Sequence, residues 1–264
     1  MNIGFIGFGN MAQAIARGLL TNKIITKDEL LFSTHRKETR EKIENAWKVK
    51  GADGNQKVVD HSDVIILAVK PHQIENVLGQ LTIPESKLIL SVAAGYPTQK
   101  LFQFLSPKQV LRVMPNLNAQ VGASMTAIAE NTAVSKKDTD TADRIFKAVG
   151  ETVFLPENQL SIFIGLAGSS PALIFMFIDT LARSAVKYGM PKDKAVKIAS
   201  QAVLGSGKTA LNSDASPWDL IDQVSSPGGI TVEAVLSLLQ SDFSNAVVTS
   251  FDKMIEKDND MSGK

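Results

Sequence analysis

The feature of this chain that most restricts its fold is a change of pattern near residue 156. Before that point short β-rich segments alternate with segments of helical period, and after it helix-length segments follow one another without a strand pattern. Strand–helix alternation is typical of a parallel sheet covered by helices on both faces. We therefore expect a doubly wound, mostly parallel α/β domain over residues 1–156 and an all-helical domain over residues 157–264.

The expected elements follow the apolar periodicity of the chain. Strands are predicted at residues 3–6, 30–33, 64–68, 88–92, 110–114, 124–129 and 152–155. Helices between them are predicted at residues 11–20, 37–44, 71–78 and 135–149. The second half is predicted to contain helices at 158–189, 191–212, 216–223 and 229–256, before a polar tail at 257–264 that we expect to fray.

The composition argues against several classes of function. With 28 Lys and Arg against 27 Asp and Glu, the net charge is +1, which argues against a general electrostatic grip on nucleic acid. The chain has no cysteine, which removes thiol nucleophiles, thiolate metal sites and disulfides. Its histidines are only His35, His61 and His72, so we expect no metal centre. Catalysis would have to rely on a cofactor, on hydroxyl groups or on backbone dipoles.

One stretch resembles a membrane span by its composition. Residues 160–182 contain a single charged side chain, Asp179, and about 20 apolar residues are enough to cross a bilayer. A Gly-Ser-Ser-Pro sequence at residues 168–171 interrupts the stretch, and no basic flank precedes it. We expect instead a helix buried in a core or in a subunit interface. Because the first residues also lack a signal-peptide pattern, we expect a cytoplasmic protein with no membrane partner.

A glycine motif joins the first predicted strand to the first predicted helix. Residues 7–12 read G-x-G-x-x-A. Gly7 permits a tight turn, Gly9 lets the backbone approach a pyrophosphate, and Ala12 allows close packing of the helix on the strand. The helix N-terminus adds its amides and the positive end of its dipole. This context predicts a Rossmann domain that binds a dinucleotide, with an ordinary glycine turn as the alternative.

The end of the second predicted strand indicates which dinucleotide is bound. An NAD site places Asp or Glu there, on the ribose 2′-hydroxyl, whereas this chain reads Ser33-Thr34-His35-Arg36-Lys37. Hydroxyls and cations match a 2′-phosphate, and Arg36 can do so through its planar guanidinium. We therefore expect NADPH as the cofactor, with NADH as the alternative. The competing interpretation is that Arg36 and Lys37 only begin a solvated helix.

Two more loops follow predicted strands at the edge where ligands of open α/β sheets bind. Residues 69–72 read Val-Lys-Pro-His after strand 64–68, and the proline restricts the turn into the next helix. His72 is a candidate general base, although a lone histidine at a helix start is more often a cap or a packing residue. The small residues 93–95 after strand 88–92 would let a nicotinamide ring approach the backbone.

The helical half contains one glycine-rich motif with a chemical meaning. Residues 225–231 read Ser-Ser-Pro-Gly-Gly-Ile-Thr and stand directly before a helical segment. The two glycines free the backbone to turn its amides inward, and together with the helix dipole they form a site for a carboxylate. The hydroxyls of Ser226 and Thr231 can donate to or accept from a ligand. The alternative is a plain helix N-cap.

A second motif, Gly-Ser-Gly-Lys-Thr at residues 205–209, looks like the end of a phosphate-binding P-loop. Ala202 stands where that motif needs its first glycine, and a helical run precedes it instead of a strand. We therefore reject an ATP site. Lys208 and Asn212 have the Lys-x-x-x-Asn spacing of β-hydroxyacid dehydrogenases, but Leu204 stands where those enzymes begin a long helix with glycine.

Five motifs span almost the whole chain. They are Phe5-Ile6-Gly7-x-Gly9-Asn10-Met11-Ala12, Ala68-Val69-Lys70-Pro71, Arg112-Val113-Met114-Pro115-Asn116, Gly168-Ser169-Ser170-Pro171-Ala172 and Ser226-Pro227-Gly228-Gly229. In this order and spacing the chain resembles the pyrroline-5-carboxylate reductases, and the Pro-Gly-Gly signature is the most specific of the five.

The resemblance implies an N-terminal Rossmann domain and a C-terminal domain that dimerises through interlocking long helices. It also implies an active site between the two domains, often shared across subunits, that reduces L-1-pyrroline-5-carboxylate to L-proline, the last step of proline biosynthesis. A homodimer unit is expected, with a decamer as a larger assembly left open.

The resemblance also implies which residues bind each molecule. Contacts to the dinucleotide would come from Ile6, Gly7, Phe8, Gly9, Asn10, Met11, Ser33, Thr34, Asn55, Ala68, Val69, Lys70, Pro71, Val92, Ala93 and Ala94. Contacts to the substrate would come from Asp214, Gln223, Gly228, Gly229, Ile230 and Thr231. The family usually has Thr or Ala where Ile230 stands, and some members have Glu for Asp214 and Asn for Gln223, which leaves the details of substrate contact open.

The expected chemistry fits the small number of ionisable groups. A cyclic imine is readily protonated near neutral pH, and the iminium carbon then accepts hydride without a strong acid from the protein. We expect the amides of residues 228–231 to bind the substrate carboxylate and Thr231, as the catalytic residue, to bond the ring nitrogen. Two alternatives are an NADP-dependent dehydrogenase of the β-hydroxyacid type and a non-catalytic NADPH-binding regulatory protein.

Overall fold

The chain folds into two compact units in a computed structural model that describes residues 1–262. Unit 1 contains residues 1–168 together with the chain end from Ile255 onward, and unit 2 contains residues 169–254. The boundary between the two compact units therefore follows Gly168, whereas the sequence pattern changes near residue 156. The reason is that helix α7 (Leu160–Phe163) buries Leu160 and Phe163 among side chains of the unit 1 sheet.

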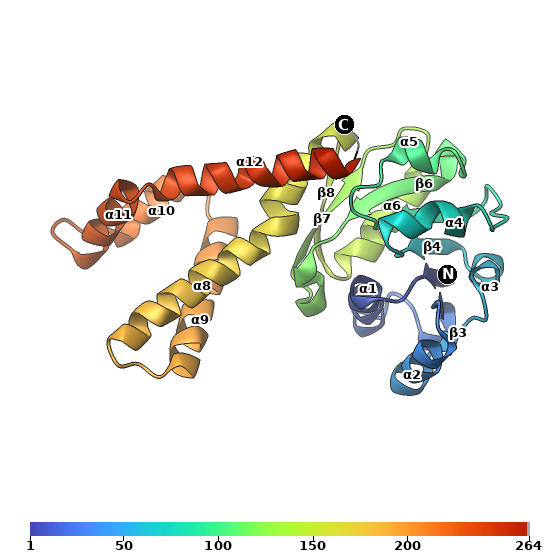
Figure 1. Cartoon of the computed structure of the whole chain (residues 1–264), viewed down its shortest axis with the longest axis horizontal. Helices are drawn as coiled ribbons and strands as arrows, with labels where there is room; N and C mark the ends of the chain where they lie inside the picture. The colour runs from blue at the N-terminus through green and yellow to red at the C-terminus, as the bar shows by residue number, and fades with distance from the viewer. Residues whose placement is uncertain (263–264) are drawn as a thin grey trace. The chain divides into compact units, whose positions relative to one another are not determined.

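Unit 1 is built on one sheet, in which the described residues form eight strands in the order β3-β2-β1-β4-β5-β6-β7-β8 (Figure 1). The strands are β1 Ile3–Ile6, β2 Leu30–Ser33, β3 Lys50–Gly51, β4 Val64–Leu67, β5 Leu88–Ser91, β6 Val110–Met114, β7 Ser124–Ala129 and β8 Gly150–Leu155. Among these strands every neighbouring pair is parallel except β6 and β7. The predicted mostly parallel α/β sheet is confirmed. Its strand order reverses between β1 and β4, which is where open sheets of this kind bind ligands.

Helices of unit 1 connect the strands. They are α1 Asn10–Thr21, α2 Lys37–Trp47, α3 Asn55–His61, α4 Ile74–Leu78, α5 Thr98–Leu101, α6 Lys136–Lys147 and α7, followed by a π-helical turn at Ile164–Ser169. Short 3-10 turns lie at Lys27–Glu29, Pro71–Gln73, Pro107–Gln109, Leu117–Val121 and Glu157–Gln159.

The sequence did not predict β3, α3 or α5. Each is short, and α3 has only Val58 and Val59 as buried side chains, too few to show a helical period. The predicted helix at 71–78 begins as the 3-10 turn Pro71–Gln73, since proline at its start supplies a fixed φ but no amide hydrogen.

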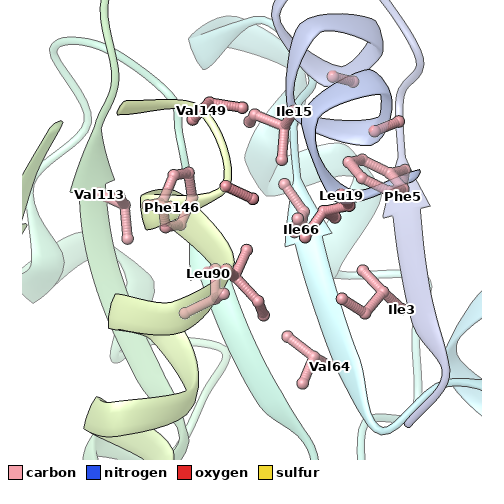
Figure 2. Close-up of a cluster of buried hydrophobic side chains, with 14 of the residues drawn as sticks. Ile3, Phe5, Ile15, Leu19, Val64, Ile66, Leu90, Val113, Phe146 and Val149 are labelled. Carbon is pink, nitrogen blue, oxygen red and sulfur yellow. The ribbon is translucent and has the colours of Figure 1, made fainter. Parts of the chain in front are cut away.

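The core of unit 1 lies on both faces of the sheet. Alternate residues of β4 enter different clusters: Ile66 packs with α1 and α6, whereas Ile65 and Leu67 pack on the opposite face. Figure 2 shows the first cluster, in which Ile15 of α1 and Phe146 of α6 meet the strands. Full burial of one such side chain contributes about 1.5–3 kcal/mol, so the continuous apolar strands hold the sheet between two layers.

Unit 2 contains only helices among its described residues. They are α8 Ser170–Lys187, α9 Lys192–Leu211, α10 Pro217–Val224, α11 Ile230–Gln240 and the first part of α12 Phe243–Ser262. The prediction of one helix over 229–256 is wrong. Helix α11 ends at Gln240, and Asp242 adopts a left-handed φ of +59° before α12 begins. Asp is one of the few non-glycine residues that enter this region at modest cost, so it can separate two helices.

The prediction that the polar tail frays from residue 257 is also wrong for the described residues. Helix α12 continues to Ser262, and its Asp258 is buried. The Asp258 carboxylate accepts a 2.6 Å hydrogen bond from the hydroxyl of Ser161 in α7. A single buried side chain therefore anchors a segment whose composition is that of a solvated end.

Unit 2 leaves most of its apolar side chains uncovered. Helices α8 and α9 pack together, yet the buried hydrophobic side chains of these two helices include only small ones, such as Ala182, Ala195 and Ala199. Large apolar side chains of unit 2 that are exposed include Ile174, Phe175, Met176, Phe177, Leu181, Leu204, Trp218, Leu236, Leu239 and Val248. A surface of this kind marks an interaction site in a folded protein.

Part of this surface belongs to a helical stretch that has the composition of a membrane span. Within the described chain, one helical stretch, Glu157–Lys187, is long and apolar enough to cross a bilayer. In its most apolar segment of 18 residues, 22% is buried. The same composition is found in core and interface helices of soluble proteins, so it does not distinguish the two environments.

Candidate active site

The turn between β1 and α1 is tight because of one glycine. Gly7 has a φ of +86°, and a Cβ at this position would lie 2.9 Å from the carbonyl oxygen of Ala68, at the end of β4. Its amide donates a 3.2 Å hydrogen bond to the carbonyl of Ser33, at the end of β2. Gly7 therefore forms the tight turn predicted from the motif, and its backbone lies close to the ends of β2 and β4.

Gly9 has a different role at the same turn. It is the N-cap of α1, in an extended conformation, and a Cβ there would have no atom within 4 Å. Because glycine has no side chain, nothing caps the first turn of the helix from this position. The open space and the uncapped amides fit a phosphate group at the positive end of the helix dipole.

A cavity of about 400 Å³ opens in front of this helix end. Three of the predicted loops meet there, and its lining contains Gly9, Asn10, Met11, Ala68, Val69, Lys70, Pro71, Val92, Ala93 and Ala94. These residues come from the carboxyl ends of β1, β4 and β5, which lie side by side in the sheet. The cavity contains small side chains where a flat ring could lie against the backbone.

Leu117 and Gln120 also line this cavity, and the sequence did not predict them. Both belong to the 3-10 turn Leu117–Val121, and Leu117 is exposed. The turn starts after Asn116, whose side chain accepts a hydrogen bond from the amide of Asn118. A signal was present, since the Met-Pro-Asn sequence at residues 114–116 follows a predicted strand in the same way as the other loops.

Two predicted cofactor residues turn their side chains away from the cavity. Ile6 is buried in the sheet, and Phe8 is 4% exposed with its ring centre 4.5 Å from that of Phe32. Trp47 of α2 packs edge-on against the same ring. These residues can face a ligand only through their backbone. His72 is exposed in the 3-10 turn after β4 and does not line this cavity.

A second cavity, of about 480 Å³, lies next to the end of β2. Its lining includes the predicted Thr34 and Asn55, and Asn55 accepts a 2.7 Å hydrogen bond from the buried hydroxyl of Ser33. Lys37 lines it as well, whereas Arg36 is the exposed N-cap of α2 and lies outside the lining. Arg36, which the sequence singled out for the 2′-phosphate, is therefore absent from this lining, and the cations present there include Lys37 and Arg40.

Arg40 and Asp53 are the charged residues of this second cavity that the sequence did not single out. Arg40 lies one helical turn after Arg36, so the period of α2 places both on the same face without deciding which of them lines the cavity. Asp53 comes from the loop after β3, a strand that was itself not predicted. The end of β2 has no acid, as read from the sequence, but Asp53 brings a carboxylate to the same cavity.

The Pro-Gly-Gly motif of unit 2 forms a closed turn. The amide of Gly229 donates a 2.9 Å hydrogen bond to the carbonyl of Ser226, and Gly228 has a φ of +69°. Proline at the second position and a left-handed glycine at the third are the features of a type II turn. A Cβ on Gly229 would lie 2.9 Å from the carbonyl oxygen of Ser226 and 2.4 Å from its hydroxyl oxygen, so a side chain there would disturb the turn.

The turn leads directly into an uncapped helix. Gly229 is the N-cap of α11 and offers no side chain to its first amides. The amide of Gly229 itself is engaged in the turn, which narrows the predicted anion site to the amides that follow it. Ile230 is 92% exposed and Thr231 is half-buried at the start of α11. An anion at this helix end would lie against both residues.

The other predicted substrate residues are exposed in the same unit. Asp214 lies between α9 and α10, and Gln223 lies near the end of α10. The Gly-Ser-Gly-Lys-Thr sequence at 205–209 lies inside α9, in agreement with the helical run predicted before it.

Comparison with known proteins decides between the dinucleotide-binding families. The chain is 36% identical to the pyrroline-5-carboxylate reductase of Escherichia coli (strain K12), over 98% of each chain. The family model for pyrroline-5-carboxylate reductase dimerisation matches residues 157–261. This chain belongs to the pyrroline-5-carboxylate reductase family. A family model described as NADP oxidoreductase, coenzyme F420-dependent, matches residues 2–95. This range contains the turn at Gly7 and most of the residues that line the two cavities.

Solved structures of pyrroline-5-carboxylate reductases have the same fold. The enzyme from Streptococcus pyogenes superposes with a TM-score of 0.88 at 37% identity, over 98% of each chain. The enzyme from Plasmodium falciparum, solved with NADP bound, has a TM-score of 0.88 at 28% identity and covers 99% of this chain, with 98% of its own length matched. The comparisons do not favour a β-hydroxyacid dehydrogenase or a non-catalytic regulator.

Proposed function

We propose that this protein reduces L-1-pyrroline-5-carboxylate to L-proline, with NADPH as its preferred hydride donor. The observation that carries the proposal is the pair of uncapped helix starts, one in each unit, that suit the two anionic groups of such a reaction. The start of α1 suits a pyrophosphate, and the start of α11 suits a carboxylate. Full-length similarity to pyrroline-5-carboxylate reductases supports the assignment of the reaction.

The first cavity of unit 1 would hold the dinucleotide. Gly9 leaves space for the pyrophosphate at the start of α1, and the small side chains of Ala93 and Ala94 leave space for the nicotinamide ring. When bound, this cofactor supplies the hydride. The protein contributes orientation, because the residues that line the cavity restrict where a flat ring can lie.

The Pro-Gly-Gly turn of unit 2 would hold the substrate carboxylate. Its closed geometry presents the amides of Ile230 and Thr231 at the positive end of the α11 dipole. The Thr231 hydroxyl would bond the ring nitrogen and so orient the ring. Asp214, Gln223 and Ser226 would complete the contacts to the substrate. A pyrroline imine is protonated near neutral pH, so these groups need to bind and orient rather than donate a proton.

Homodimers are the assembly that the uncovered apolar side chains of unit 2 favour. Side chains such as Phe175 and Met176 cannot remain exposed without causing association, and a second copy of the chain offers the same surface. This proposal also accounts for the apolar helical stretch Glu157–Lys187 without a membrane and is consistent with a cytoplasmic protein. In this view residues 157–264 form a substrate-binding and dimerisation domain, and a decamer would be built from such dimers.

The test is an initial-rate assay with L-1-pyrroline-5-carboxylate and each reduced cofactor. We expect substrate-dependent loss of NADPH absorbance at 340 nm, formation of proline, and a higher kcat/KM with NADPH than with NADH. Binding of NADPH without turnover would contradict the reaction. A higher kcat/KM with NADH would contradict the cofactor preference alone.

A further inference from the structure

The second cavity of unit 1 contains an ion pair that lies off the predicted cofactor motif. Arg40 donates from Nη1 to the Asp53 carboxylate at 2.8 Å and to the carbonyl of Ala52 at 3.2 Å. One partner is on helix α2 and the other is in the loop between β3 and α3. Both line the cavity beside Thr34 and Asn55.

The two partners differ in how firmly they are held. The Arg40 side chain is 15% exposed, and its stem covers Gly51 so closely that a Cβ there would lie 2.4 Å from the Arg40 Cγ. The Asp53 side chain is 80% exposed and precedes Gly54, which has a φ of +107°. The guanidinium is therefore positioned by packing, whereas the carboxylate can move away from it.

Both groups keep their charges at neutral pH. The hydrogen bond and charge of Arg40, with a smaller effect of Lys57 and Lys37, hold the pKa of the Asp53 carboxyl below its ordinary value. The same hydrogen bond raises the pKa of Arg40. Lys37 points its own charge toward Glu41 at 3.8 Å, and both side chains are mostly exposed. Arg40 is thus the best-positioned cation among the described residues of this cavity.

Arg40 and Asp53 favour different substituents at the 2′ position of the adenosine ribose of a dinucleotide. Adenosine ribose carries a phosphate at its 2′ position in NADPH and a hydroxyl in NADH. A guanidinium binds phosphate through two parallel hydrogen bonds, and a carboxylate accepts from the hydroxyl but repels the phosphate. The Asp53 end of this ion pair is 80% exposed, so water and salt screen its attraction to Arg40 and a phosphate can displace Asp53 at small cost.

We propose that Arg40 binds the 2′-phosphate of NADPH and that Asp53 weakens this preference by competing for the same guanidinium and by accepting the ribose hydroxyl of NADH. The preference for NADPH is then set by a matched pair in the α2 and β3–α3 segments, and not by Arg36 alone. This inference deepens the proposed function, since it concerns the cofactor of that reaction.

Binding of two adenosine nucleotides tests the inference without any turnover. Adenosine 2′,5′-bisphosphate and adenosine 5′-monophosphate differ only in the 2′-phosphate, and calorimetry gives the dissociation constant of each for the full-length protein. Arg40→Gln should weaken binding of the bisphosphate about tenfold or more, the size of one charge-assisted interaction, and leave the monophosphate unchanged. Arg40→Lys should recover part of the loss.

Asp53→Asn should shift the balance the other way. It removes a negative charge from the cavity while an amide oxygen can still accept from Arg40, so binding of the bisphosphate should strengthen about threefold or more. Lys42→Gln is the matched control, because Lys42 is an exposed cation of α2 outside the cavity lining, and it should change neither constant by more than about twofold. Equal melting temperatures would show that each variant is folded.

The outcomes separate this inference from the proposed reaction. If Arg40→Gln binds both nucleotides as the unchanged protein does, or if Asp53→Asn weakens the bisphosphate, the assignment is wrong. If the contrast is as expected but pyrroline-5-carboxylate is not turned over, the roles of Arg40 and Asp53 stand and only the reaction fails.

Discussion

The hydroxyl of Ser161 donates a 2.6 Å hydrogen bond to the carboxylate of Asp258, which follows it by 97 residues. Both residues are buried. From the sequence, α7 is expected to belong to the helical domain, and Asp258 is expected to lie in a polar, fraying tail. Breaking the pair leaves a buried polar group without its partner.

Asp258→Ala should therefore lower the free energy of unfolding by about 1–3 kcal/mol, the cost of leaving the Ser161 hydroxyl unsatisfied. Chemical denaturation monitored by circular dichroism measures this change. Asp260→Ala, at an exposed position of the same helix, is the control and should change stability by less than about 0.5 kcal/mol. Equal effects of the two substitutions would show that the Ser161 contact contributes nothing specific.

Substitutions of the two glycines of the N-terminal motif should have different effects, with Gly7→Ala lowering stability and Gly9→Ala affecting cofactor binding. Gly7→Ala introduces a Cβ 2.9 Å from the Ala68 carbonyl at a φ of +86°, so it should destabilise the fold by about 1–2 kcal/mol or more. Gly9→Ala places its methyl group in open space with an ordinary φ of −79°, so the melting temperature should stay the same.

The space at Gly9 is where a pyrophosphate would approach the helix, so Gly9→Ala should weaken NADPH binding about tenfold or more. Fluorescence titration of NADPH measures this, with the melting temperature recorded for the same samples. Unchanged NADPH affinity in a stable Gly9→Ala protein would contradict the placement of the pyrophosphate at α1.

The turn before α11 should tolerate no side chain at its fourth position. Gly229→Ala would bring a methyl group 2.9 Å from the Ser226 carbonyl oxygen, which accepts the hydrogen bond that closes the turn, and so open the turn that presents the amides of Ile230 and Thr231. We expect KM for pyrroline-5-carboxylate to rise about tenfold or more while the NADPH dissociation constant stays the same. A parallel loss of NADPH binding would indicate a general folding defect instead of a carboxylate site.

The hydroxyl of Thr231 is expected to orient the substrate ring. Thr231→Ala should lower kcat/KM by about tenfold to a hundredfold, and Thr231→Ser, which keeps the hydroxyl, should recover most of it. Steady-state kinetics at fixed saturating NADPH measures both. If Thr231→Ala leaves kcat and KM unchanged, the hydroxyl does not contact the substrate.

The uncovered apolar face of α8 should be an interface between copies of the chain. Met176 is 70% exposed, and Met176→Glu would bury a carboxylate without a partner if a second copy covers it. Sedimentation should then show a smaller assembly than that of the unchanged protein. Val121→Glu makes the same change at an exposed apolar residue of unit 1 and should leave the assembly intact. If Met176→Glu sediments as the unchanged protein does, the interface lies elsewhere.

Much of the fold could be predicted because local signals and tertiary structure agree. The strand at 64–68 is apolar at every position, and a strand covered by helices on both faces needs that pattern. The first glycine motif was equally readable, since its backbone requirements hold wherever a strand turns into a phosphate-binding helix. The loops after β4 and β5 also meet at the first cavity as expected.

Other features depended on contacts between distant segments. The break at Asp242 has no Gly or Pro signal, and Arg40 could be distinguished from Arg36 only once the loop with Asp53 was placed beside α2. Sequence patterns report which residues are apolar or flexible along one element, and so they located the longer strands, most of the helices and both glycine turns. Which charged side chain faces a cavity, and which polar residue of a tail becomes buried, depends on partners tens of residues away. Only the tertiary structure decided that Arg40 meets Asp53 and that Asp258 meets Ser161.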